Sequence, residues 1–151
     1  MSLANIESLD HDGRGVAHVD GKAIFIAGAL PGEIVEYASY RRKRSYEKAH
    51  AVSVLRPSSQ RVAPPCPHFG TCGGCSMQHL NLPGQTAAKQ RVLEDALWHI
   101  ARLKPEQLFP PIAGTGAAYR SRARLSVRHV DSKGGALVGF REKHSSYVAV
   151  M

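Results

Sequence analysis

The sequence predicts a mixed fold: a small β-barrel, then a metal-binding loop, then a region of helix and strand. Three observations predict this order. Short alternating apolar runs separated by turn residues fill residues 1–57. All three cysteines fall within one ten-residue window. Apolar residues then recur at helical spacing and give way to further strand patterns. The expected divisions are therefore 1–57, 58–82 and 83–151.

Five short strands are expected in the first segment. Asp-Gly and Pro-Gly turns separate most of them. So many strands in so short a segment favour a closed barrel, because closure removes exposed sheet edges. A barrel of the oligonucleotide-binding type fits this pattern, and another small barrel with no nucleic-acid role is the alternative. The expected strands are Ala4 to Leu9, Gly15 to Val19, Lys22 to Ala27, Glu33 to Tyr40 and Tyr46 to Arg56.

The positive charge is unevenly distributed along the chain. The net charge is +8, and residues 37–62 hold seven Lys and Arg against one acidic residue. Such a concentration of positive charge indicates a polyanionic partner, above all a nucleic acid. A basic surface without a specific partner is the alternative.

The densest positive charge lies between two predicted strands of the barrel. Four consecutive cations are flanked there by two aromatic residues. Cations supply phosphate contacts and aromatic rings supply stacking faces, the two features that single-stranded RNA recognition uses. We therefore predict RNA contact here rather than a solvated charge run. The residues are Tyr40, Arg41, Arg42, Lys43, Arg44 and Tyr46.

A second set of cations alternates along the predicted strand Ser121 to Val130. Alternate side chains of a strand share one face, so four arginines would form a row with apolar residues opposite. The row is either a phosphate track or a set of ion pairs to a domain outside this chain, and the sequence leaves both open. The arginines are Arg120, Arg122, Arg124 and Arg128.

Cys66, Cys72 and Cys75 have metal-ligand spacing, Cys-x5-Cys-x2-Cys. Converging thiolates suit a soft metal, and the intervening glycines let the backbone approach it. A fourth ligand is either His68 or His79, which would make a zinc site, or a cysteine absent from this chain, which would make an iron–sulfur site. With all three thiols committed as ligands, none is available as a nucleophile.

The third segment begins with an amphipathic helix of about Gly84 to Leu103, after Asn81 and Pro83. Strands are expected at Ser121 to Val130 and Ala136 to Glu142, with a third from Tyr147 onward.

No apolar run is long enough to span a bilayer, and the N-terminus lacks the pattern of a signal peptide. The clustered thiols favour a reducing compartment, so a soluble cytoplasmic protein is expected. No glycine-rich phosphate loop or paired acids occur, and the chain by itself does not have the pattern of an enzyme.

Several motifs together resemble the RNA uracil-5-methyltransferase family, most closely its 23S ribosomal RNA (uracil-5-)-methyltransferases that carry an iron–sulfur cluster. The resemblance covers the whole chain and is most specific in the cysteine segment. The motifs are Leu30-Pro31-Gly32-Glu33, Arg61-Val62, Pro65-Cys66-Pro67, Phe69-Gly70-Thr71-Cys72-Gly73-Gly74-Cys75, Gln78-His79-Leu80, Tyr119-Arg120 and Gly139-Phe140-Arg141.

This resemblance implies a TRAM domain, which is an oligonucleotide-binding-like barrel, over residues 1–57. It implies a [4Fe-4S] cluster on Cys66, Cys72 and Cys75 with a fourth cysteine beyond this chain, and the start of a central α/β domain over residues 83–151. The S-adenosylmethionine site and the catalytic residues would lie in a further domain, so we expect an inactive N-terminal fragment of a monomeric enzyme.

The expected partner is ribosomal RNA, in a single-stranded or loop region. The alternatives are a relative that acts on transfer RNA and a complete zinc-containing RNA-binding module without an enzymatic domain.

Overall fold

The computed structural model describes residues 2–143 and 145–149. Two compact units are present. The sheet unit comprises Met1–Val62 and His79–Ala113, and the cysteine unit comprises Ala63–Gln78 and Gly114–Met151. Each unit is discontinuous in sequence, whereas the sequence predicts three consecutive segments. Within the described ranges, no helix has both the length and the apolar character that crossing a membrane requires.

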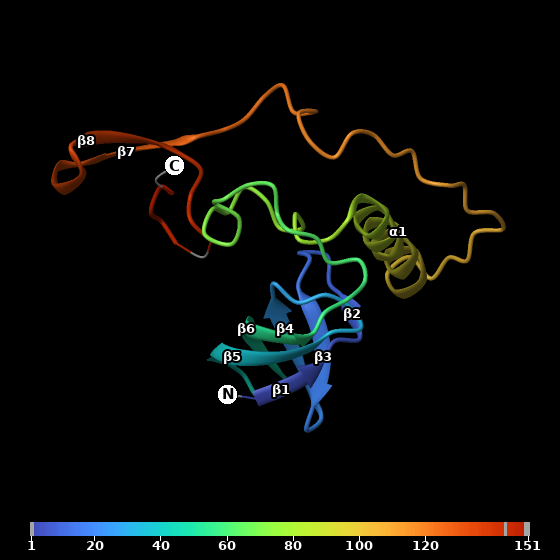
Figure 1. Cartoon of the computed structure of the whole chain (residues 1–151). Coiled ribbons are helices and arrows are strands. Elements are labelled where there is room, and N and C mark those ends of the chain that lie inside the picture. The colour runs from blue at the N-terminus through green and yellow to red at the C-terminus, as the bar shows by residue number, and fades with distance from the viewer. Residues whose placement is uncertain (1, 144, 150–151) are drawn as a thin grey trace. The chain divides into compact units, whose positions relative to one another are not determined.

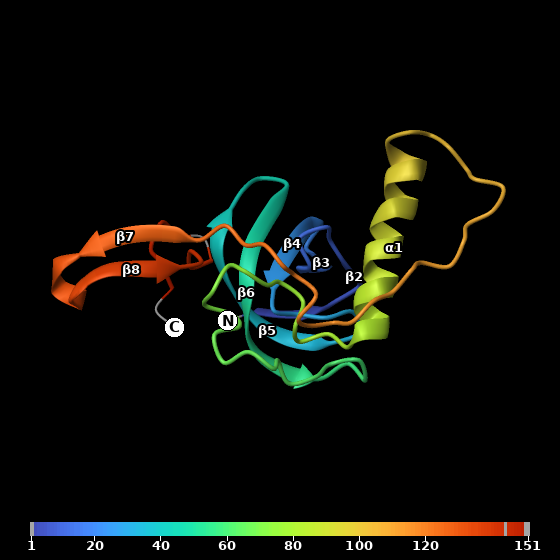
Figure 2. The same cartoon turned by 90° about the horizontal axis from the view of Figure 1, so that it is seen from above.

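The sheet unit contains a six-stranded mixed sheet (Figure 1). The strand order is β1-β5-β6-β4-β3-β2, and every pair is antiparallel except the parallel pair of β4 and β6. Figure 2 shows β5 and β6 joined by a short loop at one end of the sheet. The strands are β1 Ser2–Asn5, β2 Ser8–Leu9, β3 Gly15–Val19, β4 Lys22–Ala27, β5 Ile34–Arg42 and β6 Tyr46–Arg56.

Turn chemistry explains why the bounds of β3 and β4 agree with the prediction. Asp20 and Gly21 connect these strands, with φ angles of 49° and 76°. Two consecutive residues with positive φ form the tight hairpin turn whose twist matches that of paired strands, and Asp-Gly is a favoured sequence for it. The bounds of β6 also agree, while the fourth expected strand, Glu33 to Tyr40, is observed at Ile34–Arg42.

The core of the sheet unit lies on one face of these strands. Ile24 and Ile26 of β4 are 2% and 0% exposed, and they alternate with partly exposed neighbours. Val35 of β5 and Ala49 of β6 are buried against the same cluster. Burial of each large aliphatic side chain contributes about 1.5 to 3 kcal/mol. The period-two pattern of the sequence therefore determines which face of the sheet packs.

The expected closed barrel is wrong, because β1 and β2 are the two edges of the sheet and no ladder joins them. One N-terminal segment supplies both edges. It bends between them, so that the Ile6 N–H donates to the Glu33 carbonyl oxygen at 2.9 Å while the Glu7 N–H donates to the Val16 carbonyl oxygen at 2.8 Å. The expected strand Ala4 to Leu9 is thus divided into β1 and β2. The backbone of this segment makes its hydrogen bonds with β5 on one side and with β3 on the other, without a pair of strands that would close a barrel.

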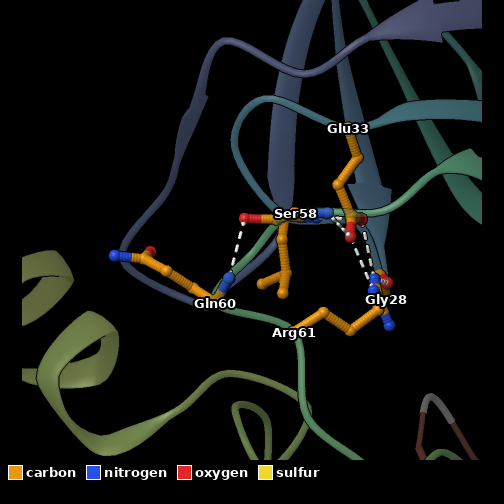
Figure 3. Close-up of polar contacts among 6 residues, drawn as sticks. Gly28, Glu33, Ser58, Gln60 and Arg61 are labelled. Carbon is orange, nitrogen blue, oxygen red and sulfur yellow. Dashed lines mark hydrogen bonds and ion pairs between the residues drawn. The ribbon is translucent and has the colours of Figure 1, made fainter.

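A buried ion pair fixes the segment that leaves the sheet after β6 (Figure 3). The Glu33 carboxylate is 0% exposed and accepts two hydrogen bonds from Arg61, at 2.6 and 2.7 Å. The backbone N–H groups of Leu30 and Ser58 also donate to it, at 2.9 and 3.0 Å. Arg61 donates in addition to the Gly28 carbonyl oxygen. Such complete pairing offsets the cost of burying the carboxylate.

Helix α1, Leu82–His99, begins at a side-chain cap. The Asn81 side-chain oxygen accepts from the Gly84 N–H at 2.9 Å, which satisfies one of the unpaired donors of the first turn. The helix ends before the predicted Leu103, because Arg102 adopts a φ of 55° that a right-handed helix cannot contain. Gly84 is its only buried residue within the described chain. On the expected apolar face, Leu93, Ile100 and Leu103 are exposed, and the other three residues, Val92, Ala96 and Leu97, are half-buried.

The cysteine unit holds one β-hairpin, formed by β7 Ser126–Val130 and β8 Gly135–Gly139 around the short helix η1 Asp131–Lys133. Both strands are shorter than the predicted Ser121 to Val130 and Ala136 to Glu142. The third expected strand, from Tyr147 onward, is reduced in the described residues to one isolated bridge, in which Val148 pairs with Arg141. The lengths of these strands are therefore set by the residues available for pairing, and not by how far the alternation of apolar residues extends.

Candidate nucleic-acid interface and cysteine loop

The predicted cationic loop lies at the tip of the β5–β6 hairpin. Arg41 and Arg42 are the last residues of β5, and Lys43 and Arg44 form the connection. All four cations are exposed. Of them, only Arg42 pairs with a carboxylate among the described residues, that of Glu47 at 3.6 Å. The other three charges are available to an anionic partner.

Glu47 neutralises part of this positive charge from the neighbouring strand. The Ser39 hydroxyl donates to its carboxylate at 2.7 Å. That hydrogen bond, together with the nearby charges of Arg42 and Lys22, holds the pKa of Glu47 below its usual range. Glu47 therefore stays ionised at neutral pH, and its carboxylate lies 3.6 Å from both the Arg42 and the Lys22 side-chain nitrogens.

The two tyrosines that flank the cations have different surroundings. Tyr40 is 48% exposed, and its ring stacks on that of His50, with centroids 6.4 Å apart and an interplanar angle of 18°. Tyr46 is half-buried and meets the Phe25 ring edge to face, with centroids 6.1 Å apart. Tyr40 thus presents a larger accessible surface than Tyr46, although the sequence predicted the same role for both.

The expected row of arginines is wrong. Arg120, Arg122 and Arg124 precede β7 and lie in irregular backbone, so they share no strand face, and only Arg128 is in the strand. Residues 121–125 have no pairing partner in the described chain because β8 matches only Ser126–Val130. Arg128 itself lies over the Tyr147 ring, 5.4 Å from its centroid. Contact of these arginines with RNA stays a prediction.

The cysteine loop is folded by short backbone hydrogen bonds. The Cys72 N–H donates to the His68 carbonyl oxygen at 2.9 Å, and the Phe69 N–H donates to that of Cys66 at 3.1 Å. The Gly74 N–H then donates to the Cys72 sulfur at 3.4 Å. Backbone N–H groups that point at sulfur are a feature of thiolate sites, where they tune the metal centre.

The cysteine loop also pairs with the chain after β8. The Gly73 N–H donates to the Arg141 carbonyl oxygen at 2.8 Å, and the Lys143 N–H donates to that of Thr71 at 2.8 Å. A β-carbon on Gly73 would lie 2.9 Å from the Arg141 carbonyl oxygen, and one on Gly74 would lie 3.3 Å from the Phe140 ring. The glycines thus serve this close approach of two chain segments, beyond the approach to a metal that the sequence suggests.

Lys143 extends over the same loop and was not singled out by the sequence. Its ammonium lies 4.8 Å from the centroid of the Phe69 ring. Burial lowers the pKa of Lys143, and electrostatic interaction with Cys75 and Cys72 opposes that shift. An isolated lysine after a strand carries no sequence signal, so only the folding of the loop reveals this position.

The three cysteines have the donor chemistry of a soft metal site but are not assembled into one. They are free thiols; Cys66 and Cys72 are partly buried and Cys75 is exposed. Within residues 2–143 and 145–149, no group of three or more His, Cys, Asp and Glu side chains is close enough to hold a metal ion. His68 and His79 therefore complete no zinc site there. Thiols are the right kind of ligand for an iron–sulfur cluster, but these cysteines supply only three of the four ligands that such a cluster needs.

The chain matches one domain family near its N-terminus and several curated proteins along its whole length. The TRAM domain family matches residues 3–36. The chain is 60% identical over 149 residues to the 23S rRNA (uracil(1939)-C(5))-methyltransferase RlmD of Dechloromonas aromatica, which is 99% of this chain and 34% of the relative. It is 61% identical over 151 residues to the protein of the same name from Bordetella pertussis, which is 100% of this chain and 32% of the relative.

The resemblance to the 23S rRNA (uracil-5-)-methyltransferases is confirmed. A third protein of this name, from Chromobacterium violaceum, is 61% identical over 151 residues, which is 100% of this chain and 29% of the relative. The chain spans about a third of the length of these relatives. The TRAM match ends at residue 36, whereas the sheet continues to Arg56. The cationic loop is thus in the same sheet as the TRAM match but beyond the matched residues.

Two motif residues behind that resemblance have a structural role in the sheet unit. Glu33 ends the motif Leu30-Pro31-Gly32-Glu33, and Arg61 opens the motif Arg61-Val62. They form the buried ion pair described above. The sequence alone offers no reason to pair them, because they lie 28 positions apart.

Proposed function

We propose that this chain is the RNA-binding and cluster-binding part of an S-adenosylmethionine-dependent methyltransferase that forms 5-methyluridine in 23S ribosomal RNA. The observation that carries the proposal is the identity of 58 to 61% along the whole chain to proteins that bear this name. Those names favour ribosomal over transfer RNA. A cytoplasmic, monomeric enzyme is part of the same proposal.

The β5–β6 hairpin supports RNA binding physically. Arg41, Lys43 and Arg44 are exposed and form no ion pair with the described residues, so their charges are available to phosphates. Neutralising phosphates releases counterions, which gives binding a strong dependence on salt. A loop at the end of a rigid sheet can hold such contacts in a fixed register.

The decisive experiment measures the affinity of the chain for an unmodified 23S ribosomal RNA fragment over a series of salt concentrations. In the loop variant, the four cations of the hairpin are replaced by alanine. Each lost phosphate contact is expected to lower the slope of log affinity against log salt by about 0.7 to 0.9. The replaced residues are Arg41, Arg42, Lys43 and Arg44.

A matched variant controls for net charge alone. It removes four exposed cations around helix α1 and should leave the salt slope unchanged, because a local contact rather than total charge is proposed. If both variants lower the slope equally, the hairpin is not the RNA contact. The control residues are Lys89, Arg91, Arg102 and Lys104.

We also propose that Cys66, Cys72 and Cys75 hold a [4Fe-4S] cluster together with a ligand outside this chain. When bound, the cluster would join the ends of a loop that contains few apolar residues, and metal binding would then supply folding free energy. The full-length protein, prepared without oxygen, is expected to contain iron and acid-labile sulfide. Cys72→Ser should reduce both, whereas Thr71→Ser keeps all three thiols and should not. Stoichiometric zinc without sulfide would overturn the cluster.

The methyl transfer itself is assigned to residues outside these 151 positions. S-adenosylmethionine supplies the methyl group in such an enzyme, and we assign no residue of this chain to its binding. A labelled-methyl assay on unmodified 23S ribosomal RNA should show transfer by the full-length protein and none by this chain. Transfer by this chain alone would contradict that division.

A further inference from the structure

We propose that the outward face of strands β4, β5 and β6 stacks the bases of single-stranded RNA, with Tyr40 and His50 as its central platform. This inference rests on the proposed RNA-binding function and extends it from phosphate contacts at the hairpin tip to base contacts on the sheet. It adds Phe25, Lys48 and His50 to the interface.

The first observation is a β-bulge that places Tyr40. Ser39 pairs with Ala49 and Arg41 pairs with Lys48, so the register shifts at Tyr40, which is an extra residue of β5. A bulge redirects the side chain of its extra residue. Here the Tyr40 ring lies nearly parallel to that of His50, at 18°, with centroids 6.4 Å apart. Both residues are exposed, so these two nearly parallel rings leave aromatic surface open to solvent.

The second observation is that the flanking positions on the same face are aromatic and cationic. Ala49 and Ile26 are buried, so Lys48 of β6 and Phe25 of β4, one position earlier in each strand, point to the opposite face. These two residues are partners in the parallel register. The Phe25 ring is also contacted by the Arg14 guanidinium, 5.4 Å from its centroid. Aromatic and cationic side chains therefore share this face of β4, β5 and β6.

The third observation is electrostatic. Arg41 and Lys48 are direct cross-strand partners, and neither forms an ion pair with the described residues. Like charges directly opposite each other destabilise a sheet. A bound anion would remove this repulsion. The arrangement therefore favours a polyanion, and the flat rings beside it favour one whose bases can stack.

An extended single-stranded RNA satisfies both requirements, because its phosphates and its unpaired bases are accessible at once. A duplex hides the faces of its bases, so it could use the cations but not the Tyr40–His50 platform. An acidic peptide could pair with the cations as well, but it offers few flat faces. We therefore assign the platform to unpaired bases.

The test compares two single-stranded probes on the 151-residue chain. One is an oligouridylate of about 12 nucleotides, within the usual site size of this kind of fold. The other is a ribose-phosphate strand of the same length without bases. Tyr40→Leu and His50→Leu should each weaken oligouridylate binding by roughly 5- to 150-fold, as loss of a stacked base does, and leave the abasic strand unaffected. The salt slope should not change, because no phosphate contact is removed.

Tyr40→Phe is the matched control, since it keeps the ring and should retain oligouridylate affinity. Both positions are exposed, so thermal unfolding should be the same in all variants. The proposal is overturned if Tyr40→Leu and Tyr40→Phe bind alike, or if wild type does not prefer oligouridylate to the abasic strand. It is also overturned by preferential binding of duplex RNA or of an acidic peptide. Failure of wild type to bind any RNA would instead contradict the proposed function itself.

Discussion

The sheet unit and the cysteine unit differ in what holds them together. In the sheet unit, Ile6, Ile24, Ile26 and Val35 are almost fully buried in one cluster. In the described part of the cysteine unit, the buried apolar residues are Val148 and Ala149. A segment that buries so little cannot offset the conformational entropy of ordering its chain. The sheet unit therefore has an apolar core of its own, whereas the described cysteine loop is held mainly by backbone pairing, to which the proposed metal would add.

The largest effect is expected from breaking the buried ion pair of the sheet unit. Glu33→Ala leaves the Arg61 guanidinium and two backbone N–H groups without their acceptor, so the free energy of unfolding should fall by about 3 to 5 kcal/mol. Urea unfolding followed by circular dichroism measures this. Glu36→Ala is the control, since it loses one hydrogen bond from Ser53 and should cost about 1 kcal/mol. Equal losses would mean that the ion pair is not what anchors β5.

Protonation of Glu33 at low pH should lower the free energy of unfolding by less than Glu33→Ala does, because the side chain and its neighbours remain in place. Burial opposes ionisation of Glu33, but hydrogen bonds from Arg61, Ser58 and Leu30 outweigh it and hold its pKa below the usual range. A depressed pKa in the folded state stabilises the protein above the unfolded pKa, near 4.3, and this contribution is lost as pH falls through the folded value. Unfolding measured against pH should show this loss in wild type. Glu33→Gln should lack it, and an identical pH dependence in both would refute the assignment.

In the cysteine unit, Gly73→Ala should loosen the pairing of the loop with Arg141. The added β-carbon would lie 2.9 Å from the Arg141 carbonyl oxygen, and such overpacking costs about 1 to 3 kcal/mol. Hydrogen exchange at the Gly73 and Lys143 N–H groups should become faster, while the unfolding midpoint of the sheet should not move. Gly114→Ala is the matched control, because a β-carbon there meets no atom within 4 Å. A shift of the sheet's midpoint would show that the two regions are not independent.

The smallest effect concerns helix α1, which belongs to the sheet unit but packs little of its surface. Asn81→Ala removes the side-chain acceptor of the Gly84 N–H and should destabilise the helix by about 1 kcal/mol. The helical signal in circular dichroism should decrease without a shift of the sheet's transition. Asn81→Asp keeps an acceptor and should preserve the helix. An equal shift of the sheet's transition would mean that helix and sheet fold as one.

Local patterns predicted most of the sheet. The bounds of β3, β4 and β6 agree with the alternation of apolar residues and with the Asp20-Gly21 turn, because both depend on neighbours in sequence. The position of the four cations between two strands follows from the same pattern. The cysteine spacing likewise predicts a thiolate loop from adjacent residues. The metal and the RNA contacts stay predictions that await the experiments above.

The strand lengths and registers that local patterns did not predict depend on pairing between residues distant in sequence. Whether Arg120, Arg122 and Arg124 lie in a strand depends on the length of its partner, and β8 ends the ladder at Ser126. The division of the first strand into β1 and β2, and the bulge at Tyr40, likewise depend on the register with distant strands. The sequence by itself determined which residues alternate, where the chain turns and which side chains carry charge or sulfur. Only the tertiary structure decided which of them meet, because strand pairing, ion pairs and close backbone approaches join residues that no local period relates.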